Sequence, residues 1–220
     1  MRGLLNSLLD LLYPPKCAFC RNLVRDGRML CPVCEKTLPR PSREMQRQKI
    51  SHLAVCLSPL YYTEDVRASL LRYKFHGAAA YYHIYAELMT DCLCEQGCSA
   101  DLITWVPLSR KRLRRRGYDQ ARLLAEEIAR LTGIPCEQTL EKTRNNPAQS
   151  VTGSEEARKQ NVQDVYRPVT SFTGEHVLLV DDIVTTGATL SAAAKELLAA
   201  GAEEVSALTL ARAVSQEKRQ

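Results

Sequence analysis

The sequence predicts an α/β protein with a doubly wound parallel sheet, preceded by a small module in which four cysteines hold a metal ion. From residue 101 onward, apolar runs typical of strands alternate with segments of helical periodicity, and this order favours a parallel sheet between helices. The run 176–180 (HVLLV) has no polar alternation, as expected of a strand buried on both faces. Two Cys-x-x-Cys pairs before residue 45 mark the separate module.

Length and composition suit this division. The chain has 220 residues, of which 45% are hydrophobic and 25% charged, which is ordinary for a globular protein. One α/β domain of about 150–170 residues plus a small module fits that length. We therefore expect an N-terminal helix and the cysteine module at 1–45, the α/β domain at 50–220, and a linker in the polar segment 39–49.

The leucine-rich segment 1–13 is expected to form the N-terminal helix, with its leucines on one broad face. Asn6, Ser7 and Asp10 interrupt the apolar run, which makes it unsuitable as a membrane span. It also lacks the small-residue cleavage site of a signal peptide. We expect this helix to pack on its own protein or on a partner, and the protein to be cytoplasmic.

The first part of the α/β domain is expected to contain a strand and two helices. Residues 53–62 (LAVCLSPLYY) are apolar and typical of a strand. The segment 64–76 places apolar side chains at helical spacing, and 78–96 continues as a second helix. The apolar run 101–106 (DLITWV) then predicts a short strand.

Helices and strands continue to alternate along the rest of the chain. Apolar side chains occupy one face of segment 120–131, and Gly133 ends this helix. Thr152 and Glu155 have the spacing of a capping box, which predicts a short polar helix. The remaining expected elements are the strand at 176–180, a helix at 189–200 that Gly201 stops, and a strand at 204–210.

Four of the nine cysteines form two Cys-x-x-Cys pairs. Ten residues separate the pairs, a spacing typical of a closed tetrahedral zinc site, and four thiolates leave no open position for catalysis, so the zinc would be structural. An iron–sulfur centre is the alternative. The other cysteines form no second set of pairs, so one metal site in a reducing cytosol explains the pattern better than disulfides. The predicted ligands are Cys17, Cys20, Cys31 and Cys34.

The stretch 177–190 (VLLVDDIVTTGATL) carries the most information about function. An apolar strand ends in Asp181 and Asp182, whose carboxylates do not belong in a core unless they are paired or used. A ribose 5-phosphate needs carboxylates to bind its sugar hydroxyls and amides to bind its phosphate, and this stretch offers both. The alternative is that the segment forms only a turn followed by a helix cap. The amides and hydroxyls that would form a phosphate socket at the next helix belong to Thr185, Thr186, Gly187, Ala188 and Thr189.

The net charge of +5 is concentrated in one segment. Residues 110–116 (RKRLRRR) carry six positive charges, so the rest of the chain has a net charge of −1. Such a cluster suits a polyphosphate, because arginine forks match phosphate oxygens. A solvated charge run that begins a helix is one alternative, and a backbone-binding patch for single-stranded DNA is another.

The stretch 177–190 resembles the phosphoribosyl-pyrophosphate loop of type I phosphoribosyltransferases. The resemblance implies the fold of that family, with Asp181 and Asp182 as the catalytic pair that holds the ribose 2′ and 3′ hydroxyls, and 185–189 holding the 5-phosphate. It also implies Mg²⁺, bound by the two aspartates directly or through water. Thr185 stands where enzymes for hypoxanthine and guanine usually have an acid, which weighs against those acceptors.

The resemblance extends to the whole chain. Together with the cysteine pairs, the segments 73–77 (YKFHG) and 106–121 (VPLSRKRLRRRGYDQA) make it similar to the ComF family of competence-associated proteins. That family more often has Asn where Asp119 stands, and an acid would be unfavourable beside a pyrophosphate. The residues that the resemblance assigns to the pyrophosphate are Pro107, Leu108 and Ser109 in the loop, and Arg112 and Arg116, which would fold over it as a lid.

Two classes of function follow from the resemblance. In the first, an enzyme transfers ribosyl 5-phosphate from phosphoribosyl pyrophosphate, with Mg²⁺ and release of pyrophosphate, to an acceptor that the sequence does not identify. In the second, the protein senses phosphoribosyl pyrophosphate without turnover, or binds single-stranded DNA or other competence proteins during DNA uptake. Fold alone does not decide between these functions.

Overall fold

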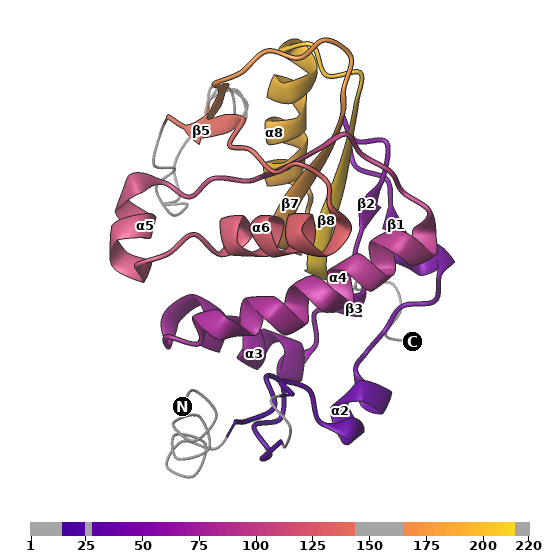
Figure 1. The fold of residues 1–220 in the computed structure, drawn as a ribbon, viewed down its shortest axis with the longest axis vertical. Coiled ribbons are helices and arrows are strands. Elements are labelled where there is room, and N and C mark those ends of the chain that lie inside the picture. Colours follow the sequence, from indigo (N-terminus) through magenta and orange to yellow (C-terminus); the bar gives the residue numbers. More distant parts are fainter. Residues whose placement is uncertain (1–14, 25–27, 144–164, 214–220) are drawn as a thin grey trace, which may run out of the picture.

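The structure, a computed structural model, describes residues 15–24, 28–143 and 165–213 (Figure 1). Two expected elements, the helix at 1–13 and the short helix opened by Thr152, lie outside these ranges. The described helices are α2 (Pro32–Thr37), α3 (Glu64–Phe75), α4 (Tyr82–Gln96), α5 (Arg110–Arg116), α6 (Gln120–Thr132) and α8 (Ala188–Ala199), with 3-10 turns at η1 (Glu44–Gln46) and η2 (Ala79–Tyr81).

A central sheet runs through the larger part of the molecule. Its order is β1-β2-β8-β7-β4, and β3 pairs with β8 next to β2. All of these pairings are parallel except β1 with β2. A separate antiparallel pair joins β5 (Leu140–Lys142) to β6 (Tyr166–Pro168). The strands of the central sheet are β1 (Arg47–Gln48), β2 (Cys56–Leu57), β3 (Leu60–Tyr61), β4 (Leu102–Trp105), β7 (His176–Val184) and β8 (Glu204–Arg212).

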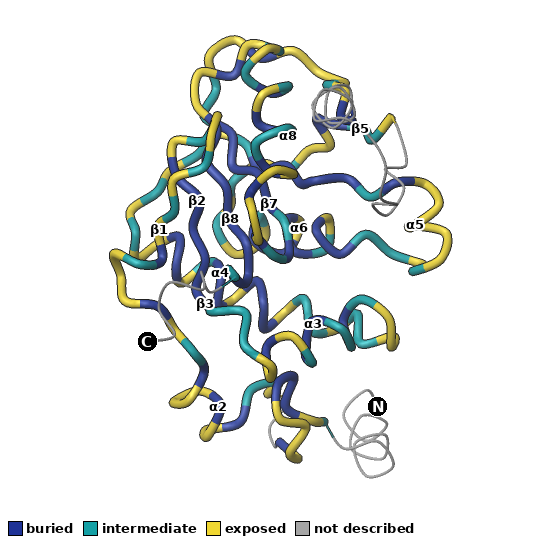
Figure 2. Tube along the Cα trace, turned by 180° about the vertical axis from the view of Figure 1, so that it is seen from behind, coloured by how far each residue is buried: buried dark blue, intermediate teal, exposed yellow. Residues whose placement is uncertain are grey.

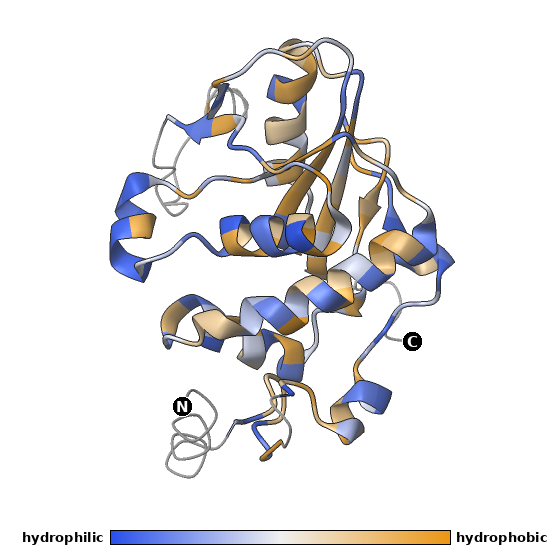
Figure 3. Ribbon diagram, viewed as in Figure 1, coloured by the Kyte–Doolittle hydropathy of each residue, from blue (hydrophilic) through white to orange (hydrophobic). Residues whose placement is uncertain are grey.

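Helices cover both faces of the sheet, which confirms the doubly wound arrangement. Alternate side chains of β7 enter two different cores: Leu178 and Val180 pack with residues of α3, α4 and α6, whereas Val177 and Leu179 pack with residues of α8. The central strands are therefore buried and strongly hydrophobic (Figures 2 and 3). Because the central strands are buried along their length, their polar side chains can contact solvent or a ligand mainly at the strand ends.

The structure corrects four details of the expected elements. The strand at 53–62 is two strands, β2 and β3, separated at Ser58 and Pro59, because proline has no N–H for the ladder. The expected linker at 39–49 contains η1 and β1, and β1 joins the central sheet. Strand β7 continues beyond residue 180 to Val184. The arginine run forms a seven-residue helix, α5, with Ser109 as its N-cap.

No helix within the described ranges is both long enough and apolar enough to cross a membrane.

A buried carboxylate fixes the packing of α6 against α4. Glu127 on α6 accepts hydrogen bonds from Arg130 at 2.8 and 2.9 Å, and the His83 ring of α4 lies 2.9 Å from the same carboxylate. These partners, Arg130 first and His83 after it, outweigh burial and lower the Glu127 pKa from 4.5 to about 2. The carboxylate therefore remains ionised in mildly acidic solution.

Glu127→Gln should lower the free energy of unfolding by about 1–3 kcal/mol at pH 7. Because the folded-state pKa is depressed, this stabilisation is present above the unfolded-state value and is lost as the pH falls from about 4.5 toward 2. Urea denaturation of both proteins between pH 2.5 and 7 measures the difference. The control is Glu126→Gln, which removes only an exposed pair with Arg122; a pH-independent difference for Glu127→Gln would contradict the assignment.

Candidate functional site

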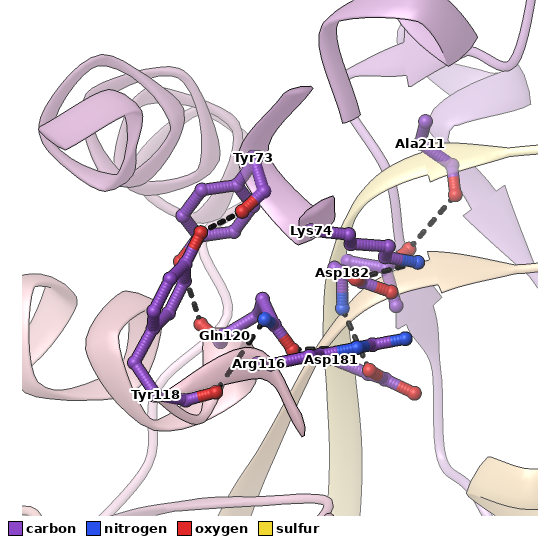
Figure 4. Close-up of polar contacts among 9 residues, drawn as sticks. Tyr73, Lys74, Arg116, Tyr118, Gln120, Asp181, Asp182 and Ala211 are labelled. Atoms are coloured by element: carbon purple, nitrogen blue, oxygen red, sulfur yellow. Dashed lines mark hydrogen bonds and ion pairs between the residues drawn. The ribbon is translucent and has the colours of Figure 1, made fainter. Parts of the chain in front are cut away.

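Three segments meet where β4 and β7 end. The loop after β4 leads into α5, the end of β7 leads into α8, and the end of α3 lies against both (Figure 4). In a parallel sheet the carboxyl ends of neighbouring strands lie at one edge, and β4 and β7 are parallel neighbours. The residues that the sequence singled out after β4 and β7 thus lie at one edge of the sheet.

The segment expected to form a phosphate socket lies at the start of α8. Gly187 is its N-cap, with φ at 79°, a conformation that favours glycine. A Cβ at this position would also lie 2.8 Å from the Ile50 side chain, so both conformation and space require glycine. The side chain of Thr186 accepts a hydrogen bond from the Ala188 amide at 3.4 Å. The first-turn amides of a helix lack intrahelical acceptors, which makes this end suitable for an anion.

The two aspartates differ in their surroundings. They are successive residues of β7, so their side chains point toward opposite faces. Asp182 is buried and faces α3, whereas Asp181 is partly exposed and accepts a hydrogen bond from the Asp182 amide at 2.8 Å. Burial, with the Asp182 charge added to it, raises the Asp181 pKa from 3.8 to about 7. A ligand or cation that neutralises this charge would relieve that cost.

Lys74 at the end of α3 provides the cation for the buried aspartate. Its ammonium lies 2.7 Å from the Asp182 carboxylate, and the two side chains are 18% and 9% exposed. Helical periodicity alone makes a lysine at this position an ordinary surface residue, so pattern reasoning missed the contact. The only sequence signal was its place in the segment 73–77 that resembles the ComF family.

The side chain of Arg116 extends from α5 toward the acidic pair (Figure 4). It donates to Gln120 Oε1 at 2.6 Å and stacks over the Phe75 ring, with 4.9 Å between Cζ and the ring centroid. Burial lowers the Arg116 pKa, and the Asp182 charge opposes that shift. Arg116 borders a cavity of about 540 Å³ between α3 and α5, whose other lining residues are Lys74, Phe75, Gly77, Arg115 and Tyr118.

Arg112 lies one turn before Arg116 on α5. It is exposed, and its charge adds to burial in lowering the pKa of Lys142 on β5. Its charge also adds to burial in lowering the Arg116 pKa, so the two arginines that the resemblance groups together lie next to each other on α5.

Asp119 connects the loop after β4 to α6. Its carboxylate accepts the Leu108 amide at 3.0 Å and the Arg122 amide at 3.3 Å, the second as the N-cap of α6. Burial raises its pKa, although these amide bonds act in the opposite direction. Asp119 therefore has a structural role in which each carboxylate oxygen accepts one amide, whereas asparagine has only one oxygen to offer, and the Leu108 amide already has an acceptor. Ser109 is buried and its hydroxyl oxygen caps α5, accepting from Arg112 N at 3.4 Å.

The four paired cysteines form a compact cluster. All four sulfurs lie within 4.8 Å of one another, and those of Cys20 and Cys31 are 3.6 Å apart. Zinc–sulfur bonds of about 2.3 Å in tetrahedral geometry place sulfurs about 3.8 Å apart, so the cluster fits this metal. Burial acts to raise the Cys17 pKa, but hydrogen bonds from backbone groups of Cys31, Cys20 and Phe19 outweigh it and bring the pKa to about 7. Burial raises the pKa of Cys20 and of Cys34.

Comparison with known families agrees with both parts of the chain. A phosphoribosyl transferase domain model matches residues 115–220, and a double zinc ribbon domain model matches residues 8–45. The first covers the acidic pair and the segment 185–189, and the second contains all four clustered cysteines. The fold is that of a type I phosphoribosyltransferase behind a zinc ribbon module.

Curated relatives resemble nearly the full length of the chain. The DNA utilization protein YhgH of Salmonella typhimurium is 30% identical over 204 residues, covering 89% of each chain. Competence protein ComFC of Bacillus subtilis is 30% identical over 216 residues, covering 93% of this chain and 88% of the relative. Competence protein F of Haemophilus influenzae is 37% identical over 111 residues, 49% of this chain and 48% of the relative. The chain therefore belongs to the ComF family of competence-associated proteins, with a phosphoribosyltransferase-like domain and an N-terminal zinc ribbon.

Proposed function

We propose that this protein binds phosphoribosyl pyrophosphate together with Mg²⁺ at the edge of the sheet where β4 and β7 end. The observation that carries the proposal is the succession of acidic pair, Gly187 turn and α8 N-terminus within nine residues of one strand–helix connection. The amides suit the 5-phosphate, and the carboxylates suit the ribose hydroxyls. Lys74 and the arginines of α5 supply positive charge for the pyrophosphate.

The residues present accommodate Mg²⁺ beside Asp181 more readily than beside Asp182. The Asp182 charge is already paired with Lys74, whereas Asp181 carries the raised pKa and faces partly to solvent. Asp181 would hold the ion directly or through water, with Asp182 completing the acidic environment. When bound, Mg²⁺ neutralises charge on the departing pyrophosphate.

For the reaction we propose transfer of ribosyl 5-phosphate to an acceptor. The bond from ribose C1 to the pyrophosphate oxygen breaks, pyrophosphate leaves with the electron pair, and an acceptor that loses a proton bonds to C1. The carboxylates stabilise positive charge at the ribose, and the arginines stabilise the leaving group. Release of pyrophosphate from isotope-labelled phosphoribosyl pyrophosphate, in the presence of a nucleobase panel, distinguishes transfer from binding alone. The names of the relatives support a role in competence or DNA use. We propose that the protein has this role in the cytoplasm.

Asp181→Asn combined with Asp182→Asn should weaken phosphoribosyl-pyrophosphate binding at least about tenfold, which corresponds to about 1.4 kcal/mol. The amides keep the size of the side chains but cannot accept two hydroxyl hydrogen bonds or hold a cation as the carboxylates do. Calorimetry in Mg²⁺ measures the affinity. Glu204→Gln, which removes an exposed carboxylate at the opposite end of β8, is the control. Unchanged affinity in the folded double variant would overturn the ribose assignment.

Arg112→Ala combined with Arg116→Ala should reduce affinity for phosphoribosyl pyrophosphate by about tenfold or more and leave most of the affinity for ribose 5-phosphate. The 5-phosphate binds at the α8 end, away from these side chains, so only the pyrophosphate contacts are lost. Calorimetry with both ligands tests this, with Arg110→Ala/Arg114→Ala as the control on the same helix.

A different result would favour nucleic acid as the partner of α5. Six of the seven residues of this helix are basic, and most are exposed. If the helix binds single-stranded DNA, both double variants should bind the two small ligands normally. Both should then lose DNA affinity and show a shallower salt dependence. Equal loss of both small ligands would contradict the lid.

We further propose that the cysteine cluster holds one structural zinc per chain. Cys31→Ser combined with Cys34→Ser should release the metal and destabilise the module, because a unit this small has little core of its own. Elemental analysis and limited proteolysis of the purified protein measure both effects. Cys94→Ser/Cys98→Ser, outside the cluster, should retain the metal. Iron in place of zinc, or a folded module without metal, would contradict the assignment.

A further inference from the structure

Helix α3 contacts both the cysteine cluster and the proposed ligand site. It lies between the N-terminal module and the sheet (Figure 1). Toward the module, Ser69 Oγ donates to the carbonyl of Ala18 at 2.5 Å, and Arg72 Nη2 donates to the carbonyls of Ala18 and Phe19, both at 2.8 Å. Two residues after Arg72, the Lys74 ammonium meets Asp182. One turn of helix therefore holds both contacts.

The carbonyls that Arg72 binds belong to the metal-binding turn. Ala18 and Phe19 are the two residues between Cys17 and Cys20, so their orientation depends on both sulfurs binding the same ion. Arg72 Nε is buried with no hydrogen-bond partner in the described part of the chain, so the guanidinium depends on these carbonyls. Loss of the metal would free the turn and remove the acceptors that hold this face of α3.

A row of aromatic rings provides a second link along the same path. Phe19 of the turn lies 5.8 Å from Tyr85, measured between ring centroids, and Tyr85 lies 5.3 Å from Tyr73 on α3. Tyr73 is fully buried, lies 5.9 Å from Tyr118, and donates to the carbonyl of Gln120 at 2.9 Å. Close-packed side chains of this kind transmit displacement, because the core has no free volume to absorb it.

We propose that the cysteine module positions Lys74 at Asp182 through α3, with Arg72 as the positioning residue, so that metal occupancy sets the ligand affinity of the site. The ligand part of this inference rests on the proposed function. Without the module's hold on α3, Lys74 would leave Asp182 as an uncompensated buried carboxylate facing an anionic ligand. The zinc ribbon would thereby act on a site that it does not touch.

The test uses full-length, metal-loaded protein and two measurements on Arg72→Met. First, hydrogen exchange of the peptide 70–77 should become faster than in the wild type, because the end of α3 loses an anchor. Second, the Kd for ribose 5-phosphate should rise about fivefold or more, within the usual range of coupling between sites. Arg67→Met is the matched control on the same helix, since Arg67 pairs only with the exposed Glu64 at 3.1 Å among the contacts described.

A double-mutant cycle separates positioning from general destabilisation. Lys74→Met should itself weaken ligand binding, and in that background Arg72→Met, or removal of the metal with a chelator, should cause no further loss of affinity. Arg72→Lys, which retains the charge and one donor, should recover part of the wild-type affinity. Each variant is compared at a temperature at which circular dichroism shows it folded.

Unchanged exchange at 70–77 in Arg72→Met would overturn the proposal, as would equal losses of affinity with and without Lys74. These results are distinguishable from failure of the proposed function. If the wild type binds neither ribose 5-phosphate nor phosphoribosyl pyrophosphate, the assigned ligand is wrong, and the exchange of peptide 70–77 still decides whether Arg72 holds α3 in place.

Discussion

The ion pair between Lys74 and Asp182 connects the parts of this molecule that matter for function. Asp182 belongs to a strand buried on both faces, where an unpaired carboxylate would cost several kcal/mol. Lys74 compensates that charge at 2.7 Å, and it can do so only while α3 lies across the end of β7. The position of α3 depends in turn on its packing against α4 and α6 and on its bonds to the cysteine turn. Helix α3 therefore contacts both the acidic pair and the metal module.

The site holds more charge than a stable core requires. The fold places the Asp181 carboxyl where burial and the neighbouring Asp182 charge raise its pKa. Such arrangements are common at functional sites, because a bound cation or ligand recovers the cost. Arg116 is a second group of this kind. It is partly desolvated and stacks on the exposed ring of Phe75, and its Nε has no hydrogen-bond partner among the described residues. Both groups border the place where a phosphorylated sugar would bind.

Side-chain caps hold the loop after β4 at both of its helical neighbours. Asp119 holds the Leu108 amide and caps α6, and Ser109 caps α5, so both helices next to the loop begin at fixed points. This rigidity limits the conformational entropy lost on binding. Because the Leu108 amide already donates to Asp119, it is not free to donate to the proposed pyrophosphate. The arginine side chains of α5 are therefore the better candidates for that contact.

Local sequence patterns determined the elements and the chemistry of each loop. Three patterns each predicted the structure of their own segment, because each depends only on residues close together in the chain. They are the uninterrupted apolar run of β7, the glycine and threonines at the start of α8, and the spacing of the cysteines. The ends of elements were less predictable. Strand β7 continues through both aspartates because β8 offers pairing partners as far as Arg212, and Gln46 to Gln48 join the fold because β2 lies beside them.

Only the tertiary structure decided which distant residues meet. The contacts of Lys74 with Asp182 and of Arg72 with the cysteine turn join segments far apart in the chain, and Asp119 accepts the amide of Leu108, 11 residues earlier. A lysine near a helix end and an aspartate before a helix look ordinary in sequence, because nothing in their local pattern records the partner. Their roles arise from the packing of α3 and α6 on one face of the sheet, which the sum of many weak apolar contacts determines.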